Sequence, residues 1–364
     1  MRLVDEFRDA EAVAGLREAI ARRLSRPAKI MEVCGTHTMA IARAGVRQLL
    51  PPTVSLISGP GCPVCVTAQG EIDAFLALGE CPGVVLASFG DMLRVPGSTG
   101  SLETLKARGT ETRVVYSPMD AVRLAAASPE KEVVFFGIGF ETTVPTVAAA
   151  LLEACRLGLR NFSVLSAHKR VPPALAALAT DPELAVDGFL LPGHVSVILG
   201  LEPYRFLAEQ HQIPCAIAGF EVTDILEGIL HLVTQIADGR AALANQYPRV
   251  VRPEGNPTAR ALMERVFTPT DAVWRGIGPI AASGLALRPE FAPWDARQKF
   301  ALDWDRFANV PEPPACRCGD ILKGIASPHD CPLFGRGCTP ARPIGPCMVS
   351  SEGTCAAYYR YQIG

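Results

Sequence analysis

The sequence predicts an α/β protein with two related parallel-sheet domains and a C-terminal cysteine-rich domain. Three observations lead to this prediction. From residue 28 to about 238, short apolar runs alternate with segments of helical spacing, a pattern typical of parallel sheets with crossover helices. A loose Gly-Phe-Glu-x-Thr repeat indicates that the units are related. Six of the 12 cysteines lie between residues 316 and 355, where few other signals of regular structure occur.

Eight apolar runs have the length and composition of buried strands. In chain order they are "AKIMEV", "TVSLIS", "GVVLASF", "TRVVYS", "EVVFFGI", "FSVLSA", "VDGFLLP" and "PCAIAGF". Eight strands are more than one small sheet needs, so we expect two four-stranded halves that divide near residues 125–131. The predicted domains are therefore residues 28–128 and 129–240. A closed barrel of eight units is the alternative, which the uneven strand and loop lengths disfavour.

The chain changes character after residue 240. Proline, arginine and aromatic residues become frequent, and the final stretch is dominated by cysteine, glycine and proline. Too little periodicity remains for many helices or strands. We therefore expect residues 241–364 to form a third domain that something other than a large apolar core holds together. A helix within residues 1–27 is expected to pack on this domain.

Composition excludes several classes of function. The 364 residues are 49% hydrophobic and 20% charged, with a net charge of −2, so electrostatics does not favour binding to nucleic acid or to an anionic membrane. The N-terminus lacks the apolar segment of a signal peptide, and no apolar stretch reaches the ~18 residues of a membrane span. We expect a soluble cytoplasmic protein. In that reducing compartment, 12 cysteines indicate metal or redox chemistry rather than a disulfide framework.

Cys34 lies in "MEVCGTHT", at the end of the first predicted strand. Thr36 or Thr38 is expected to cap a following helix, "MAIARAGVRQLL". A cysteine at a helix N-terminus has a lowered pKa, so we expect a thiolate there. The imidazole of His37 is expected to donate a hydrogen bond to that thiolate or to its ligand.

Cys62 and Cys65 lie in "GPGCPVC", directly after the second predicted strand. A C-x-x-C motif that follows a strand and opens a helix is typical of thiol redox sites. Neighbouring parallel strands lie ~4.8 Å apart, so this loop and that of Cys34 could open into one crevice. Three thiolates and one imidazole would then face a single spot. The alternative is that these cysteines are simply buried, as we expect for the isolated residues Cys81, Cys155 and Cys215.

Acidic residues follow several predicted strands. Glu141 in "GIGFETT" has counterparts in "AIAGFEVT" and, more loosely, in "LASFGDM". Such a carboxylate could stabilise the positive end of a helix, or it could face a ligand at the carboxyl ends of the strands. His168 and His194 also follow predicted strands and have the same two interpretations.

The C-terminal cysteines have the spacing C-x-C-x12-C-x6-C-x8-C-x7-C. Zinc sites favour C-x2–4-C pairs, which are missing here, whereas four-iron clusters accept wider and irregular spacing. Six cysteines leave two beyond the four ligands of a cluster, and these two could form a redox-active disulfide. Cys316 and Cys318 should point in opposite directions along an extended chain, so we expect one of each kind. A zinc site, with His329 as a further ligand, and plain buried thiols are the alternatives.

Four segments together carry a family resemblance: "MEVCGTHT", "SGPGCPVCVT", "GFETT" and "CPLFGRGCTPARPIGPCMVSSEGTCAAYYRY". They resemble the HypD family of hydrogenase maturation factors over essentially the full length. The resemblance implies two related α/β domains and a third that carries a [4Fe-4S] cluster. It also implies that the protein and a small HypC-like chaperone form the scaffold on which the Fe(CN)2CO group of [NiFe]-hydrogenases is assembled. Cyanide would come from a HypE-like donor working with a HypF-like carbamoyltransferase.

The resemblance also implies roles for individual residues. Iron would bind at Cys34, with Cys62 and Cys65 as the neighbouring metal or redox pair, and the candidate catalytic set would include His37 and Glu141. The family's cluster surroundings are similar to those of ferredoxin–thioredoxin reductase. This likeness places the cluster on Cys316, Cys331, Cys338 and Cys355, with Cys318 and Cys347 as the redox pair. The expected protein is a maturation scaffold with redox activity rather than an independent enzyme. The alternatives are an iron–sulfur-dependent disulfide reductase and a zinc-stabilised binding module.

Overall fold

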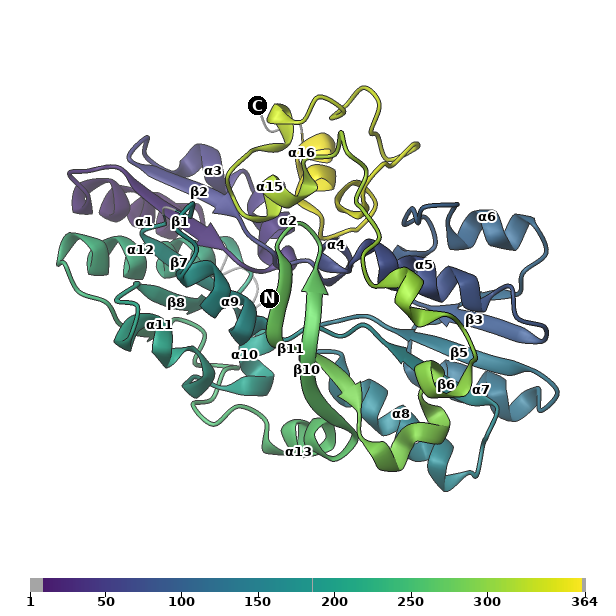
Figure 1. Cartoon of the computed structure of the whole chain (residues 1–364). Coiled ribbons are helices and arrows are strands. Elements are labelled where there is room, and N and C mark those ends of the chain that lie inside the picture. Colours follow the sequence, from purple (N-terminus) through teal and green to yellow (C-terminus); the bar gives the residue numbers. More distant parts are fainter. Residues whose placement is uncertain (1–8, 185, 362–364) are drawn as a thin grey trace.

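The structure is a computed structural model that describes residues 9–184 and 186–361. Two open parallel sheets lie on either side of a long hairpin, and the cysteine-rich C-terminal region lies at one end of the hairpin (Figure 1). None of the helices in the described ranges has both the length and the apolar character needed to cross a membrane.

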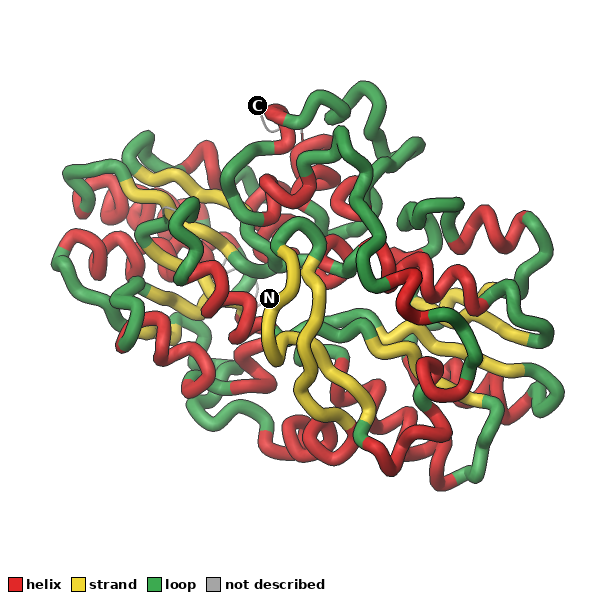
Figure 2. Tube along the Cα trace, viewed as in Figure 1, coloured by secondary structure: helices red, strands yellow, loops and turns green. Residues whose placement is uncertain are grey.

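Each sheet contains only parallel pairs. The first has the order β2-β1-β7-β8-β9 and the second the order β4-β3-β5-β6 (Figure 2). The strands of the first sheet are β1 (Ala28–Glu32), β2 (Val54–Ser58), β7 (Gly188–Pro192), β8 (Cys215–Ala218) and β9 (Leu243–Asn245). Those of the second are β3 (Val84–Ser88), β4 (Thr112–Val114), β5 (Glu132–Gly137) and β6 (Phe162–Ser166).

All eight predicted runs form strands, but the predicted division of the chain is wrong. The expected boundary between residues 128 and 129 would separate β3 from β5, which pair with Val84 opposite Glu132. The chain leaves the first sheet after β2, builds the whole second sheet, and returns at β7 to pair with β1. The barrel alternative is also wrong, because the two sheets are separate. All eight runs are similarly apolar, so the sequence carried little information about which strands become neighbours.

Helices cover both sheets. Between the strands lie α2 (Gly35–Arg43), α3 (Val46–Leu49), α4 (Pro63–Val66), α5 (Gln69–Leu78), α6 (Leu102–Ala107), α7 (Pro118–Ala127), α8 (Val144–Arg156), α9 (Val171–Ala179), α10 (Gly193–Leu199), α11 (Arg205–Glu209) and α12 (Val222–Ala237). Helix α1 (Ala10–Arg23) packs on α12 and shares its buried apolar cluster with the first sheet. Arg23 adds a hydrogen bond of 3.4 Å to Thr234 and an ion pair to Asp238. The expectation that the N-terminal helix packs on the third domain is therefore wrong, because its apolar side is matched by α12.

The segment after β9 is more regular than predicted. Helix α13 (Pro257–Val266) packs on α8, and β10 (Phe267–Trp274) pairs antiparallel with β11 (Gly278–Leu287). This hairpin is anchored by Arg275, which is buried and donates to Thr67 O at 3.0 Å and to Gln69 Oε1 at 2.9 Å. The short elements η4 (Pro289–Trp294), α14 (Ala296–Lys299) and η5 (Trp304–Phe307) follow.

The C-terminal region contains little regular structure, as predicted. Its elements are α15 (Cys318–Leu322), η6 (Pro328–Asp330), η7 (Pro346–Met348) and α16 (Thr354–Tyr361). Most of its buried apolar side chains, five of the six cysteines among them, join the largest apolar cluster of the molecule, which also contains Cys62 and Cys65. The region is therefore packed against the sheet units rather than tethered to them by a linker.

Candidate metal and redox site

The loops after β1 and β2 touch each other at a glycine. The Gly35 N–H donates to Gly61 O at 2.8 Å. A Cβ atom on Gly61 would lie 2.2 Å from the backbone nitrogen of Cys34, so no side chain fits at that position. The prediction that the loops of Cys34 and Cys62 meet at the carboxyl ends of adjacent strands is confirmed.

Cys62 and Cys65 form a disulfide with a Cα–Cα distance of 5.2 Å. Cys62 is the N-cap of the short helix α4, and the Cys65 N–H donates to Cys62 Sγ at 3.1 Å. Both residues are buried. The predicted arrangement of a C-x-x-C motif after a strand and at the start of a helix is confirmed, and it places a thiol pair directly beside the loop of Cys34.

Helix α2 begins four residues earlier than expected, at Gly35, with Cys34 as its N-cap. Neither predicted cap forms, because both threonines lie inside the helix and donate to carboxylates. Thr38 Oγ1 donates to Glu32 Oε1, and Thr36 Oγ1 donates to Glu352 Oε1, each at 2.6 Å. The start of the helix is thus fixed by contacts that include a residue far along the chain.

The expectation of a lowered pKa at Cys34 is wrong. Burial raises the pKa of the Cys34 thiol to about 12, and the charges of Glu352 and Glu32 act in the same direction. The backbone N–H groups of His37 and Thr36 lower this pKa by less. Burial also raises the pKa of Glu32 to about 7. The Cys34 sulfur therefore carries its proton, and a metal that binds there must displace it.

The imidazole of His37 points away from Cys34. Its Nε2 lies 2.8 Å from Gly219 O, beyond the end of β8, and its ring centroid lies 4.7 Å from that of Phe220. Burial lowers the pKa of His37 to about 4, so the ring is neutral. The predicted contact between this imidazole and the cysteine is wrong; the His37 backbone N–H acts on the sulfur instead. The ring of His194 stacks on the same Phe220 ring, with 4.0 Å between the two centroids.

Glu141 is 1% exposed and accepts a hydrogen bond of 3.0 Å from the Val171 N–H, at the first residue of α9. It therefore stabilises the N-terminus of a later helix rather than that of α8, which follows it. Burial raises the pKa of Glu141 to about 7. Its counterpart Glu221 is the N-cap of α12, so the helix-end interpretation holds for both residues. A catalytic role for Glu141 stays a prediction.

All six C-terminal cysteines line one small cavity, together with apolar residues that include Leu333, Phe334 and Met348. The expectation that Cys316 and Cys318 point in opposite directions is wrong. Arg317, which lies between them, has φ −93° and ψ 25°, so the chain is not extended there, and the two side chains share a hydrogen bond.

Hydrogen bonds between these thiols separate their pKa values. A hydrogen bond with Cys318 lowers the pKa of Cys316 to about 7. Hydrogen bonds from Cys318 and Cys355 hold the pKa of Cys347 well below its usual range. The same contacts raise the pKa values of Cys318 and Cys355. Cys318 thus lies next to both Cys316 and Cys347.

Within residues 9–184 and 186–361, no group of three or more His, Cys, Asp or Glu side chains is arranged to hold a single metal ion. The chemistry of the donor set nonetheless fits a sulfur-ligated cluster. Six thiols face one cavity whose other lining side chains are apolar, and clusters of this kind are held by several thiolates in a shielded site.

Residues 348–354, which connect Cys347 to Cys355, touch both groups of cysteines. We call this segment the connecting loop. Its Ser350 Oγ lies 3.4 Å from Cys62 Sγ, and its Glu352 accepts the hydrogen bond from Thr36 in helix α2. Helix α4 also packs on η7, which contains Cys347. The disulfide, the Cys34 loop and the C-terminal thiols therefore form one continuous assembly.

Comparison with known proteins identifies the family of the chain. Residues 11–362 match the HypD family, described as "Hydrogenase formation hypA family". The chain belongs to the HypD family. It is 45% identical over 370 residues to the hydrogenase maturation factor HypD of Rhodobacter capsulatus, covering 99% of this chain and 98% of that protein. The hydrogenase expression/formation protein HupD of Azotobacter chroococcum mcd 1 is 47% identical over 371 residues (99% and 97%). The HypD of Escherichia coli (strain K12) is 45% identical over 370 residues (100% and 98%).

The sequence patterns did not identify three residues of this site: Glu32, Ser350 and Glu352. Glu32 carried a usable signal, because a carboxylate inside the apolar run "AKIMEV" must find buried partners. Ser350 and Glu352 carried none. Their contacts with Cys62 and Thr36 span 288 and 316 residues, and no local pattern encodes them.

Proposed function

We propose that this chain is the scaffold and redox protein on which the Fe(CN)2CO group of [NiFe]-hydrogenases is assembled. Membership of the HypD family supports a role in hydrogenase maturation. The observation that carries the proposal is the connecting loop, which brings a lone thiol and a C-x-x-C disulfide together with six further thiols. We place the protein in the cytoplasm, where its other thiols stay reduced.

Iron would be cargo rather than a resident cofactor. Soft thiolate ligands suit iron in a low oxidation state, whereas four protein thiolates would close the site. Cys34 is 7% exposed and outside any disulfide, so it can supply one ligand. A second thiolate from a HypC-like chaperone would leave positions for cyanide and carbon monoxide. Cyanide would come from a HypE-like donor, itself supplied by a HypF-like carbamoyltransferase.

The remaining cysteines would handle electrons. Cys316, Cys331, Cys338 and Cys355 would hold a [4Fe-4S] cluster, which when bound supplies electrons one at a time. Cys318 and Cys347, which share a hydrogen bond, would form a second dithiol pair. The Cys62–Cys65 disulfide accepts two electrons and two protons to give two thiols. In that state its sulfurs become available to the iron beside Cys34.

The deciding experiment replaces Cys34 in the complex with the HypC-like partner. Cys34→Ala should abolish the cyanide and carbonyl infrared bands of the anaerobically purified complex, since the iron would lose the thiolate ligand that anchors it to this chain. The brown absorbance of the cluster should stay at its wild-type level. The matched control is Cys215→Ala, which removes a buried thiol at the start of β8 and should leave the bands in place. Retention of both bands in Cys34→Ala would exclude the role of Cys34.

A second candidate is an iron–sulfur-dependent disulfide reductase. The disulfide at Cys62–Cys65, packed beside the C-terminal thiols, favours it. A turnover assay with reduced ferredoxin separates the two functions, because steady disulfide reduction without any maturation partner would support the reductase. Zinc without iron or acid-labile sulfide in anaerobically purified protein would exclude both and favour a zinc-stabilised binding module.

A further inference from the structure

The tip of the β10–β11 hairpin lies between the two groups of cysteines. On one side, the Arg275 N–H donates to the carbonyl oxygen of Val66, the last residue of α4, at 2.9 Å. On the other side, a Cβ atom on Gly276 would lie 2.1 Å from the Cα of Gly319, which directly follows Cys318. The hairpin tip therefore touches α4, which carries the disulfide, and α15, which begins at Cys318.

Arg275 brings a buried positive charge to this tip. The residue is 2% exposed, and its guanidinium donates to two neutral oxygens, Thr67 O at 3.0 Å and Gln69 Oε1 at 2.9 Å. Among the described residues, no carboxylate forms an ion pair with it. A buried charge without a counter-charge is strongly destabilising, so a nearby negative group is expected.

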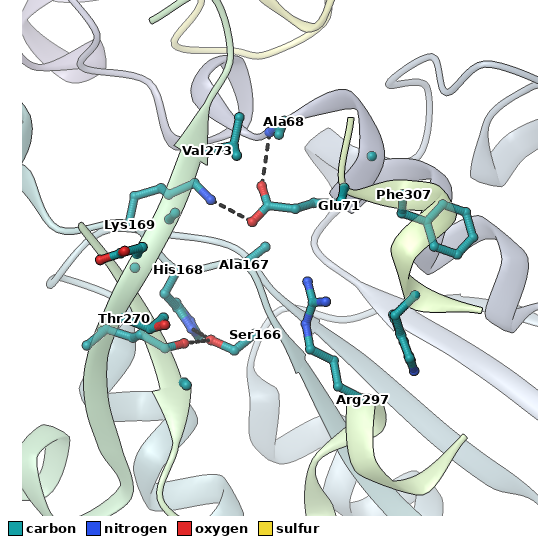
Figure 3. Close-up of a pocket in the computed structure, with 18 of the residues that line it drawn as sticks. Ala68, Glu71, Ser166, Ala167, His168, Lys169, Thr270, Val273, Arg297 and Phe307 are labelled. Carbon is teal, nitrogen blue, oxygen red and sulfur yellow. Dashed lines mark hydrogen bonds and ion pairs between the residues drawn. The ribbon is translucent and has the colours of Figure 1, made fainter. Parts of the chain in front are cut away.

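Three carboxylates lie on the segments that contact the hairpin tip, and each has other partners. Glu312 Oε1 accepts from the backbone N–H that follows the arginine, at 2.7 Å. Glu71 binds Lys169 Nζ at 2.6 Å, as Figure 3 shows. Asp73 accepts from the side-chain amide of Gln69 at 3.3 Å, so one amide separates it from the guanidinium. None of the three neutralises the guanidinium directly.

The C-terminal thiols are the remaining source of negative charge beside the hairpin tip. A hydrogen bond with Cys318 is the main cause that lowers the pKa of Cys316 to about 7, and the positive charge of Arg275 acts more weakly in the same direction. The guanidinium is therefore close enough to act on the group of thiols that would hold the proposed cluster. The net charge of an iron–sulfur cluster and its surroundings help to set its reduction potential.

We propose that Arg275 is the counter-charge of the [4Fe-4S] cluster and raises its reduction potential. This inference rests on the function proposed above, in which four C-terminal cysteines hold the cluster. Four thiolates give such a cluster a net negative charge, and reduction adds one electron to it. A fixed positive charge stabilises the reduced form more than the oxidised form. Arg275 thus acts through its charge and need not touch the cluster.

The alternative is that Arg275 only fastens the hairpin to Thr67 and Gln69, and two variants separate these roles. Arg275→Lys keeps the charge but loses the forked hydrogen bonds of a guanidinium, whereas Arg275→Met loses both. The measurement is a spectroelectrochemical titration of the cluster in the full-length, anaerobically purified chain.

Arg275→Met should lower the equilibrium constant for reduction about tenfold, the effect of one unit charge roughly 10 Å away at an effective dielectric constant of about 20. For a one-electron couple this is a shift of about 59 mV to lower potential. Arg275→Lys should stay within about twofold of the wild-type constant, because the charge remains. A purely structural role predicts the same result for both variants.

Arg170 provides a matched control on the same hairpin. Its Nη1 donates to Ala282 O at 2.7 Å, and it does not line the cavity of the C-terminal cysteines. Arg170→Met therefore removes a guanidinium that fastens the hairpin at another point. The reduction potential of the cluster should not change in this variant.

Glu312→Gln provides a second route, because it leaves the buried arginine in place. Glutamine keeps an acceptor for the Gly276 N–H but removes a negative charge beside the hairpin tip. The equilibrium constant for reduction should rise, by about two- to threefold, because this half-buried carboxylate is partly screened by solvent. The shift has the opposite sign to that of Arg275→Met.

Three results would overturn the proposal. They are a wild-type potential in Arg275→Met, equal shifts in Arg275→Met and Arg275→Lys, or, if Arg275→Met does not take up the cluster, a potential in Glu312→Gln that fails to rise. Each of them leaves the wild-type cluster and the proposed function intact. Absence of iron and acid-labile sulfide from the wild-type chain would instead overturn the cluster and this inference together, and it would be seen before any variant is compared.

Discussion

The two groups of cysteines are positioned by different means. Cys34, Cys62 and Cys65, the strand-end cysteines, follow adjacent parallel strands whose loops are locked together by the contact at Gly61. The C-terminal cysteines lie on turns and short helices with little regular structure around them. Sheet topology therefore fixes the first group without any ligand, whereas ligation would have to supply much of the order of the second.

The largest effect should come from loss of a ligand of the proposed cluster. Cys331→Ser should remove most of the bound iron and acid-labile sulfide and unfold the C-terminal region, because the binding free energy of a structural metal, of order 10 kcal/mol, is also folding free energy. Limited proteolysis should then cut within residues 316–355 while both sheets stay intact. Cys155→Ser, at a half-buried thiol on α8, is the control. If the C-terminal region of iron-free Cys331→Ser stays uncleaved, the two groups of cysteines do not differ in their need for a bound ligand.

Gly61→Ala tests the strand-end cysteines without touching sulfur. The added Cβ would lie 2.2 Å from the Cys34 nitrogen, so one loop must move, at a cost of about 3 kcal/mol. The urea midpoint of the chain should fall, and iron loading should fall with it. Gly15→Ala is the matched control: nothing lies within 4 Å of its new Cβ on α1, so the free energy of unfolding should rise by up to ~1 kcal/mol and the urea midpoint should rise slightly with it. Equal midpoints for the two variants would contradict a tight contact at Gly61.

The same contrast separates what the sequence could predict from what it could not. Strands are local, and all eight apolar runs were recognised. Their pairing is not local: Ile30 lies opposite both Leu56 and Gly188, and nothing in the apolar pattern distinguishes these partners. The β10–β11 hairpin was missed because β10 contains Pro269 and, on either side of it, the polar residues Thr268, Thr270 and Asp271, which resemble a loop.

At the site, residue types were predictable and side-chain directions were not. The meeting of the Cys34 and Cys62 loops follows from parallel strand order alone. The direction of His37 depends on Gly219 O at the end of β8, and the raised pKa of Cys34 depends on burial and on Glu352, far along the chain. Sequence spacing carries no information on either, so both expectations were wrong.

Glu141→Gln extends the comparison to a buried acid on the second sheet. The pKa of about 7 that burial gives Glu141 in the folded chain lies above the ordinary glutamate value of 4.5, so the folded chain holds this proton more tightly than the unfolded chain. Wild-type stability should therefore fall as pH rises between these two values, by up to about 3 kcal/mol. The variant keeps an acceptor for the Val171 N–H and lacks that part of the decline. Urea midpoints of both proteins, measured from pH 4 to 8, compare how the stability of each depends on pH. Parallel curves would mean that Glu141 is not held protonated.

The smallest effect concerns the joint between the two groups. Asp91 Oδ2 accepts from the Ser351 N–H at 3.0 Å and from Ser351 Oγ at 2.8 Å, which holds the connecting loop against the second sheet unit. Asp91→Ala should cost about 1–2 kcal/mol and raise hydrogen exchange in residues 348–354, while the sheets and the disulfide loop keep their protection. Asp120→Ala, which removes a half-buried carboxylate that caps α7, costs a similar amount by loss of a cap but should leave exchange in the connecting loop unchanged. If both variants loosen that loop equally, Asp91 is not the residue that joins the C-terminal thiols to the strand-end cysteines.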